Sequence, residues 1–317
     1  MLQLNDFKEK KILHVGNRPG LDNKLKFRNS NICLYRDDRF THQVSTHLIF
    51  AIYYIGELSL TSVLIKQMRE HGISLFLLND SLKTYAEITS AAEGNYILRK
   101  KQYHHNDSFA LEISRNLVLN KVQNQYNALQ KTRTGIVITD IASINGITNA
   151  KSTESMLGFE GNAAKGYFNR MFDNLKWYRR TPRTKEDIPN LLLDIGYTYL
   201  FNYVDSLLRL FGFDTYMGYY HKPFFIRKSL SCDVMEPLRP IIDYKLVKAW
   251  NLGQINEKDF YFKDGEFLIK KDFHRKYTNM FFEELMRNRE DIYTYIKNFY
   301  KHIMDPNRYH FKQYIYK

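Results

Sequence analysis

The chain has 317 residues, of which 44% are hydrophobic and 15% aromatic, so it can bury a substantial core and is not a disordered protein. It carries 47 lysines and arginines against 34 aspartates and glutamates, a formal net charge of +13. Its apolar runs are too short to cross a bilayer, its N-terminus MLQLNDFKEKK lacks the apolar stretch of a signal peptide, and its two cysteines form neither a disulfide framework nor a zinc pattern. We therefore expect a cytoplasmic globular protein.

The positive charge is concentrated in the second part of the chain. Residues 1–95 carry 12 basic and 10 acidic side chains, whereas residues 96–317 carry 35 and 24. An excess confined to one region favours a polyanionic partner there, with nucleic acid ahead of an anionic membrane surface. The alternative is a charge that serves only solubility.

Residues 1–95 have the pattern of a small β-rich domain. Four short runs rich in β-branched and aromatic residues predict strands: 12–15, 32–35, 48–54 and 74–78. Between the last two runs, apolar residues recur at helical spacing after a cap at Ser59 or Thr61, and Gly72 would end that helix. One helix among strands is therefore expected in this part.

From residue 96 onward the periodicity becomes helical. Apolar residues recur every three or four positions in five stretches: 109–130, the segment around Glu160, 190–212, the segment after Asp233, and 278–288. The change falls near residues 91–99. We predict an α+β protein with an N-terminal β-rich domain containing one helix, residues 1–95, and a larger all-α C-terminal domain, residues 96–317.

Glu160 stands in the middle of an apolar helical stripe. In SMLGFEGNAAKGYF it lies four positions after Met156 and four before Ala164, so it shares a helix face with apolar side chains. A carboxylate at such a position reaches out to solvent, pairs with a partner such as a lysine, or lines a site.

A second group of polar residues lies in GYYHKPFFIRKSLSCDVMEPLRP, residues 218–240. His221 follows a glycine–aromatic turn, and Asp233 and Glu236 are three positions apart, so on a helix they share a face. Pro237 and Pro240 require that a helix starts or kinks there. Each polar residue alone has an ordinary alternative, since a histidine is often only hydrogen-bonded and Asp233 could cap a helix.

Taken together, Glu160, His221, Asp233 and Glu236 make a chemically coherent set. Carboxylate oxygens and one imidazole suit Mg²⁺ or Mn²⁺, and the imidazole favours Mn²⁺. Such an ion serves phosphodiester chemistry because it stabilises negative charge in the transition state and on the leaving oxygen. The sequence has neither a His-Glu-x-x-His zinc motif nor a glycine-rich phosphate loop.

Basic side chains flank this set and are candidates for binding DNA phosphates. They are Arg179, Arg180, Arg183 and Lys185 in WYRRTPRTK, and Lys222, Arg227 and Lys228 between His221 and Asp233.

Four blocks of sequence, in this order, resemble the CRISPR-associated integrase family, the first-numbered and near-universal Cas protein of spacer acquisition. They are LGFEGNAAKGYF, RRTPRTKEDIPN, GYTYLFNYVDSLLRLFGFDTYMGYYH and SLSCDVMEPLRP, and they run from Leu157 to Pro240. In the first part, GELSLTSVLIKQMREHGISLFLLN is similar to the family's helix-then-strand segment. One departure is Thr181, where family members commonly carry proline. No fused reverse-transcriptase or nuclease domain is recognisable, so we expect the stand-alone form.

The resemblance implies the same fold and a set of roles. Glu160, His221 and Glu236 would be the ligands of the divalent ion, and Asp233 would be an acidic neighbour that tunes or shares it. The resemblance also implies a homodimer formed through the N-terminal domains, with two such dimers flanking a dimer of the small second Cas protein. This complex would act on foreign DNA and on the CRISPR repeat, without any membrane.

We therefore expect a CRISPR adaptation integrase that joins short foreign DNA to the array by metal-dependent strand transfer, with associated endonuclease activity. Two other functions stay open. The same site could hydrolyse branched DNA, or the protein could be a non-catalytic DNA-binding scaffold with structural carboxylates. A joined strand identifies integration, shortened strands alone identify hydrolysis, and metal-independent binding without either product identifies the scaffold.

Overall fold

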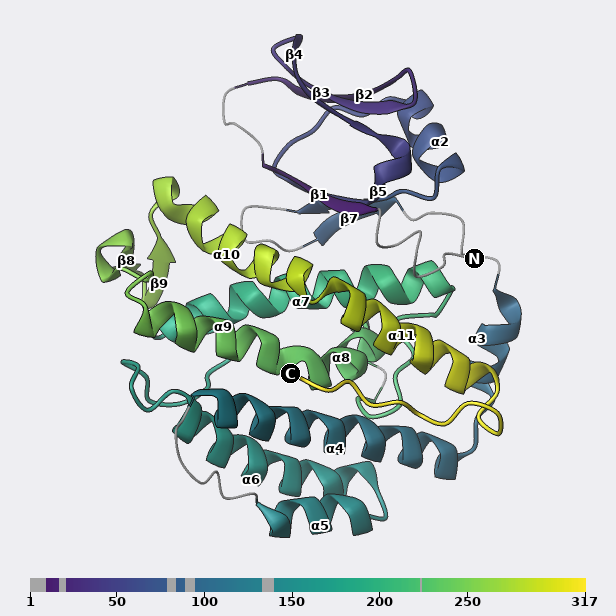
Figure 1. Ribbon diagram of the computed structural model, residues 1–317, viewed down its shortest axis with the longest axis vertical. Helices are drawn as coiled ribbons and strands as arrows, with labels where there is room; N and C mark the ends of the chain where they lie inside the picture. Colours follow the sequence, from purple (N-terminus) through teal and green to yellow (C-terminus); the bar gives the residue numbers. More distant parts are fainter. Residues whose placement is uncertain (1–9, 17–20, 79–83, 89–94, 133–139, 223) are drawn as a thin grey trace. The chain divides into compact units, whose positions relative to one another are not determined.

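The structure is a computed structural model that describes residues 10–16, 21–78, 84–88, 95–132, 140–222 and 224–317 (Figure 1). It divides into two compact units, Met1–Lys100 with Asp205–Asp214, and Lys101–Val204 with Thr215–Lys317. A β-sheet region with one helix precedes a mostly helical part, so the predicted α+β class is confirmed. The predicted change of character near residues 91–99 falls partly outside the described residues.

The first unit contains two sheets. A four-stranded sheet has the order β1-β5-β6-β7, with β7 antiparallel to its neighbour and the others parallel. An antiparallel three-stranded sheet has the order β2-β3-β4. The strands are β1 (Lys11–Gly16), β2 (Asn23–Arg28), β3 (Asn31–Arg36), β4 (Arg39–Ser45), β5 (Ile49–Ile55), β6 (Ser74–Leu78) and β7 (Thr84–Ile88). All four predicted strands are present, as β1, β3, β5 and β6, and the third begins one residue later than predicted.

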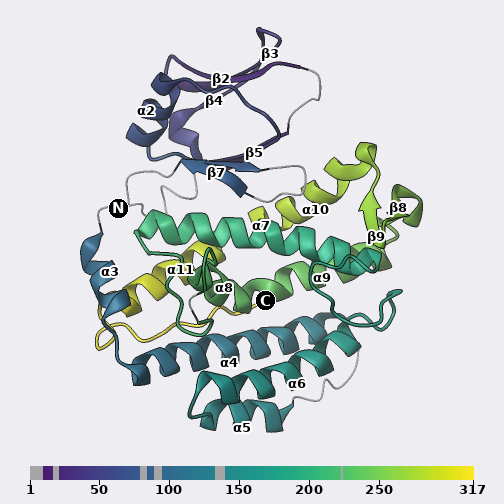
Figure 2. The same ribbon diagram turned by 180° about the vertical axis from the view of Figure 1, so that it is seen from behind.

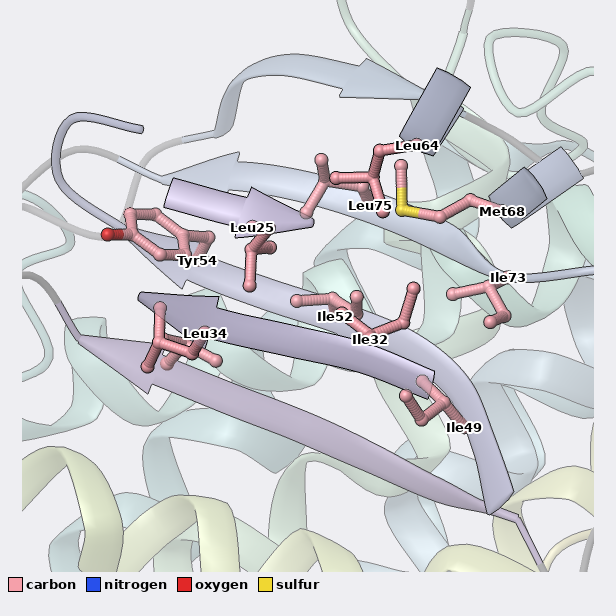
Figure 3. Packing of buried hydrophobic residues seen from close by; sticks show 11 residues of the cluster. Leu25, Ile32, Leu34, Ile49, Ile52, Tyr54, Leu64, Met68, Ile73 and Leu75 are labelled. Atoms are coloured by element: carbon pink, nitrogen blue, oxygen red, sulfur yellow. The ribbon is translucent and has the colours of Figure 1, made fainter. Parts of the chain in front are cut away.

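The predicted helix of this unit is α2 (Ser62–Glu70). Thr61 caps it, since its hydroxyl oxygen accepts a hydrogen bond from the Leu64 amide at 3.2 Å, and Gly72 adopts a φ of +70° just beyond its end. Leu64 and Met68 point from α2 into an apolar core to which both sheets contribute (Figure 3). Burial of this one face is what stabilises so short a helix.

The second part is built from helices, with a single hairpin among the described residues that helical periodicity did not predict. The helices are α3 (Tyr96–Tyr103), α4 (Asp107–Thr132), α5 (Ile141–Asn149), α6 (Thr153–Met171), α7 (Ile188–Phe211), α8 (Ser229–Met235), α9 (Arg239–Asn251), α10 (His274–Arg287) and α11 (Arg289–Met304). The hairpin joins β8 (Phe260–Lys263) to β9 (Glu266–Ile269). No helix in the described part of the chain is long and apolar enough to cross a membrane.

Helix α4 lies at the centre of the second unit. It packs against α6 on one side and against α8, α9 and the short 3₁₀-helix η3 (Glu236–Leu238) on the other, as both views show (Figures 1 and 2). Asn124 fixes this arrangement, because its side-chain amide donates to the Pro237 carbonyl at 2.9 Å and its carbonyl oxygen accepts from the Tyr316 amide at 2.9 Å. A side chain on α4 can therefore reach α6 and η3 at once.

Candidate active site

Glu160 and Glu236 meet at a lysine that the sequence pattern did not reveal. Glu160 comes from α6, Glu236 is the first residue of η3, and Lys121 projects between them from α4. The Lys121 ammonium contacts Oε1 of Glu160 and lies 2.6 Å from Oε2 of Glu236. The three side chains are only 10%, 13% and 6% exposed, respectively. This is a largely desolvated ion-pair triad.

The local sequence explains how both carboxylates reach this place. Helix α6 begins with a reciprocal capping box between Ser152 and Ser155, and its apolar row, which includes Met156 and Ala163, is buried. Glu160 lies in the same row and therefore points the same way. On the other side, Pro237 occupies the start of η3 and Pro240 the start of α9, where proline is tolerated.

Two further side chains hold the carboxylates. The Tyr220 hydroxyl donates to Oε2 of Glu160, and the Arg239 guanidinium lies 2.8 Å from Oε1 of Glu236. Burial alone would raise the pKa of Glu236, but the charges of Arg239 and Lys121 hold that pKa at about 2. Burial, reinforced by the charge of Glu160, raises the pKa of Tyr220, so its hydroxyl keeps its proton and stays a donor. We call these five residues the Lys121 cluster.

Asp233 organises the turn that carries His221. Asp233 is fully buried, and its carboxylate accepts hydrogen bonds from the backbone amides of Tyr219 at 2.6 Å, Tyr220 at 2.9 Å and His221 at 2.9 Å. Its Oδ1 also lies 2.6 Å from Nδ1 of His221. Because a carboxylate can only accept, Nδ1 carries the proton, so in the neutral form of the imidazole the lone pair is on Nε2.

Gly218 is required for this close packing. A Cβ added there would lie 2.7 Å from Oδ2 of Asp233 and 2.8 Å from the Cβ of Ser229. Any side chain at this position would therefore push the Asp233 carboxylate away from the amides it binds.

A second buried carboxylate lies on α9. Asp243 is fully buried and accepts hydrogen bonds from the hydroxyl groups of Tyr167, at 2.9 Å, and of Tyr197. Burial raises the pKa of Asp243 to about 6, since the tyrosine hydrogen bonds and the neighbouring arginines only partly offset the loss of water.

The donor set fits a divalent cation, although its present arrangement is not a metal-binding one. Two carboxylates and one imidazole nitrogen are ligands that Mg²⁺ or Mn²⁺ accept. Glu236 Oε2 is buried and makes its ion pair without a well-oriented hydrogen bond, so it keeps unused coordinating capacity. In the part of the chain that the structure describes, however, no three acidic, imidazole or thiol groups are grouped closely enough to hold a metal. Instead, the Lys121 ammonium occupies the position between Oε1 of Glu160 and Oε2 of Glu236.

The basic residues proposed from the sequence divide into two kinds. Some face protein partners: Arg180 lies 2.8 Å from the Asn190 side-chain oxygen and 2.5 Å from Asp194, and Lys185 lies 2.8 Å from Glu266. Lys222 lies 2.5 Å from Glu154 but is largely exposed, and Lys228 is half-buried. Arg179, Arg183 and Arg227 are exposed.

Sequence reasoning missed Lys121, Tyr220 and Arg239. A signal for Lys121 does exist in KVQNQ, because the lysine stands among buried positions of α4, as Glu160 stands in an apolar row of α6. Two opposite charges in two apolar stripes indicate a buried pair, but only the fold shows which helices face each other.

The family profile described as CRISPR associated protein Cas1 matches residues 20–283, a range that includes the Lys121 cluster, His221 and Asp233. The chain belongs to the Cas1 family. A relative in Thermodesulfovibrio yellowstonii, named CRISPR-associated endonuclease Cas1 1, is 27% identical over 290 residues, which cover 84% of this chain and 90% of that protein. The resemblance inferred from the four sequence blocks is confirmed.

Solved structures share the Cas1 fold along nearly the whole chain. The Cas1 protein TM1797 from Thermotoga maritima has a TM-score of 0.81 at 21% identity, covering 93% of this chain and 97% of that one. A casposase bound to integration product has a TM-score of 0.80 at 20% identity, covering 97% and 94%. A chain of a Cas6-RT-Cas1–Cas2 complex has a TM-score of 0.78 at 22% identity, covering 97% of this chain and 36% of that chain. Because these sequence identities are low, the structural similarity to these three chains establishes the fold alone.

Proposed function

We propose that this Cas1 protein is a divalent-metal-dependent DNA integrase that joins short foreign DNA to a CRISPR array. The observation that carries the proposal is the meeting of Glu160 and Glu236, from different helices, at one buried lysine. His221, whose Nδ1 is held by Asp233, directly follows Tyr220, whose hydroxyl binds Glu160. A buried group of charges contributes little net stability for its desolvation cost, and such groups are concentrated at functional sites.

In this proposal Glu160, Glu236 and Nε2 of His221 hold the ion, which is Mg²⁺ or Mn²⁺. The bound ion supplies stabilisation of the negative charge that develops on the attacked phosphodiester. Asp233 keeps the imidazole in the tautomer that leaves Nε2 free. It acts as a positioning residue, because four donors already surround its two oxygens.

The reaction is a transesterification. The 3′-hydroxyl of the incoming DNA attacks a repeat phosphodiester in line, so one P–O bond forms as another breaks, and the proton of the attacking hydroxyl goes to the released 3′-oxygen through solvent. The number of phosphodiester bonds is unchanged, so no energy source is needed. No covalent enzyme intermediate is required.

The exposed arginines at positions 179, 183 and 227 are proposed to bind DNA phosphates, with Lys222 and Lys228 beside them. Arg180 and Lys185 are proposed to shape this surface, since their charged groups already have protein partners. Each phosphate contact would steepen the dependence of DNA binding on salt concentration. The proposed partners are a second copy of this chain and the small second Cas protein. The likeness to a chain of a Cas6-RT-Cas1–Cas2 complex supports the second of these.

The test is a half-site integration assay with Mn²⁺ and, separately, Mg²⁺, using Glu160→Gln, Glu236→Gln and His221→Ala. Each variant is expected to lose strand joining by at least about a hundredfold, because each removes one ligand. Glu283→Gln is the matched control, since Glu283 is 65% exposed on α10. Joining at the wild-type rate in any of the three site variants refutes the assignment.

The same site with water as nucleophile would be a nuclease, and the endonuclease name of the relative favours that activity as a second candidate. The two reactions differ only in the attacking oxygen. Separation of the products on a denaturing gel distinguishes them, because joining produces a strand longer than either substrate strand and hydrolysis produces only shorter strands.

A further inference from the structure

Lys121 is placed where a cation bound by Glu160 and Glu236 would have to lie. Its ammonium contacts an oxygen of each carboxylate, one of them at 2.6 Å, and its side chain is 10% exposed. Lys121 comes from α4, on which Val118 and Val122 are also buried. Among the described residues, it is the one lysine that ion-pairs with both acids.

The charges of the cluster are already balanced without a metal. Glu160 and Glu236 contribute two negative charges, and Lys121 and Arg239 contribute two positive charges. A divalent ion entering this group would meet an ammonium only a few ångströms away, and repulsion at that range in a partly buried site is strong. Arg239 pairs with the other oxygen of Glu236, Oε1, whereas Lys121 pairs with both acids, so Arg239 obstructs an ion between the carboxylates less than Lys121 does.

We propose that Lys121 is a built-in counterion that the divalent metal must displace from Glu160 and Glu236, and that it thereby sets the metal concentration at which the site loads. This inference rests on the proposed function, because it takes the metal to bind at these carboxylates. Before loading, Lys121 stabilises the helical unit by pairing two buried acids, which without it would keep only Tyr220 and Arg239 as partners among the described residues. During loading, it competes with the metal.

The competition has a measurable consequence in the absence of DNA. Lys121→Met removes the competing charge but keeps a side chain of similar length. The variant is expected to bind Mn²⁺ about tenfold or more tightly than the wild type. It should melt at a lower temperature in EDTA, because each carboxylate loses one of the two partners described above. If Lys121 were needed only for folding, its replacement would lower the melting temperature without raising the affinity for Mn²⁺.

The experiment uses the full chain and Mn²⁺ alone, with binding followed by loss of the free-ion electron paramagnetic resonance signal and stability followed by thermal melting. Lys165→Met is the matched control, because Lys165 is exposed on α6 and its loss changes the net charge equally. Its Mn²⁺ affinity is expected to stay within about twofold of the wild type. Glu160→Gln reports whether the ion binds at this site.

Two outcomes overturn the inference in different ways. If Glu160→Gln weakens Mn²⁺ binding but Lys121→Met binds like the wild type or more weakly, Lys121 does not compete, and the proposed function survives. If Glu160→Gln binds Mn²⁺ as tightly as the wild type, the ion lies elsewhere, and both ideas fail.

A measurement on the wild type covers the case in which Lys121→Met does not fold. Acetylation of Lys121 by a soluble amine reagent, followed by peptide mass spectrometry, is expected to rise several-fold when Mg²⁺ is added, because displacement frees the ammonium. Labelling of Lys165 should not change. Equal labelling of Lys121 with and without Mg²⁺ contradicts displacement.

Discussion

Replacing Asp233 with asparagine tests the positioning of His221, because the change keeps the size of the side chain and removes its charge. In the wild type, the carboxylate accepts from three backbone amides and lies 2.6 Å from Nδ1 of His221. An asparagine has one acceptor oxygen, so its amide nitrogen must face groups that are themselves donors.

The size of the effect follows from these contacts. Hydrogen bonds to a charged group contribute about 1.5–3 kcal/mol each, and asparagine can keep two of the four only in weaker, neutral form. We therefore expect Asp233→Asn to lower the free energy of unfolding by roughly 3–5 kcal/mol. The asparagine amide would also donate to Nδ1 of His221, which moves the ring proton to Nε2 and removes that nitrogen as a ligand.

Two assays separate these effects. Urea unfolding measures the stability, and Mn²⁺ titration at a temperature where the variant is folded measures the affinity, which should fall about ten- to a hundredfold. Asp264→Asn, at an exposed position in the β8–β9 turn, is the control. A folded Asp233→Asn protein with wild-type Mn²⁺ affinity would show that Asp233 does not act through the imidazole.

Three further predictions concern residues around the site. Because the folded-state pKa of Asp243 is raised to about 6 from an ordinary 3.8, the native state holds this proton more tightly, so the stability it confers is present at low pH and is lost as pH rises through 6. Relative to Asp243→Asn, the wild type should lose about 1–2 kcal/mol between pH 5 and 7.5 in urea unfolding, and parallel pH profiles would contradict this. Gly218→Ala should cost about 1–3 kcal/mol and weaken Mn²⁺ binding, because its Cβ would meet the Asp233 carboxylate; an unchanged Mn²⁺ affinity would contradict the second part. Arg180→Ala should lower the melting temperature, because Arg180 pairs with Asp194. Arg183→Ala, at an exposed position, should leave the melting temperature unchanged and reduce the salt dependence of DNA binding by about one counterion. The reverse pattern would contradict both assignments.

The sequence predicted the strands that are apolar and missed those that are polar on one face. Strand β2, with sequence NKLKFR, alternates lysine with apolar residues, and β4, with sequence RFTHQVS, is mostly exposed. Their signal lay in the turns instead. Asn29 and Ser30 both adopt positive φ in the two-residue turn between β2 and β3, and Asp37 and Asp38 do the same between β3 and β4.

For the site, residues close in sequence were easier to group than residues brought together by the fold. Asp233 and Glu236 share a short segment, and Glu160 is recognisable in the sequence as a charged residue in an apolar row. Lys121 lies 39 positions from Glu160, and no local rule pairs them. The sequence also could not show that Arg180 binds Asp194, because a run of basic residues has the same sequence pattern whether it faces DNA or a carboxylate.

The central claim is that Glu160, His221 and Glu236 hold one divalent ion, and anomalous diffraction from crystals soaked in Mn²⁺ tests it most directly. The account predicts one strong peak within about 2.0–2.4 Å of an oxygen of each glutamate and of Nε2 of His221, with the Lys121 ammonium withdrawn from it. A Mn²⁺ peak elsewhere in the molecule, with Lys121 still bridging the two glutamates, would contradict it.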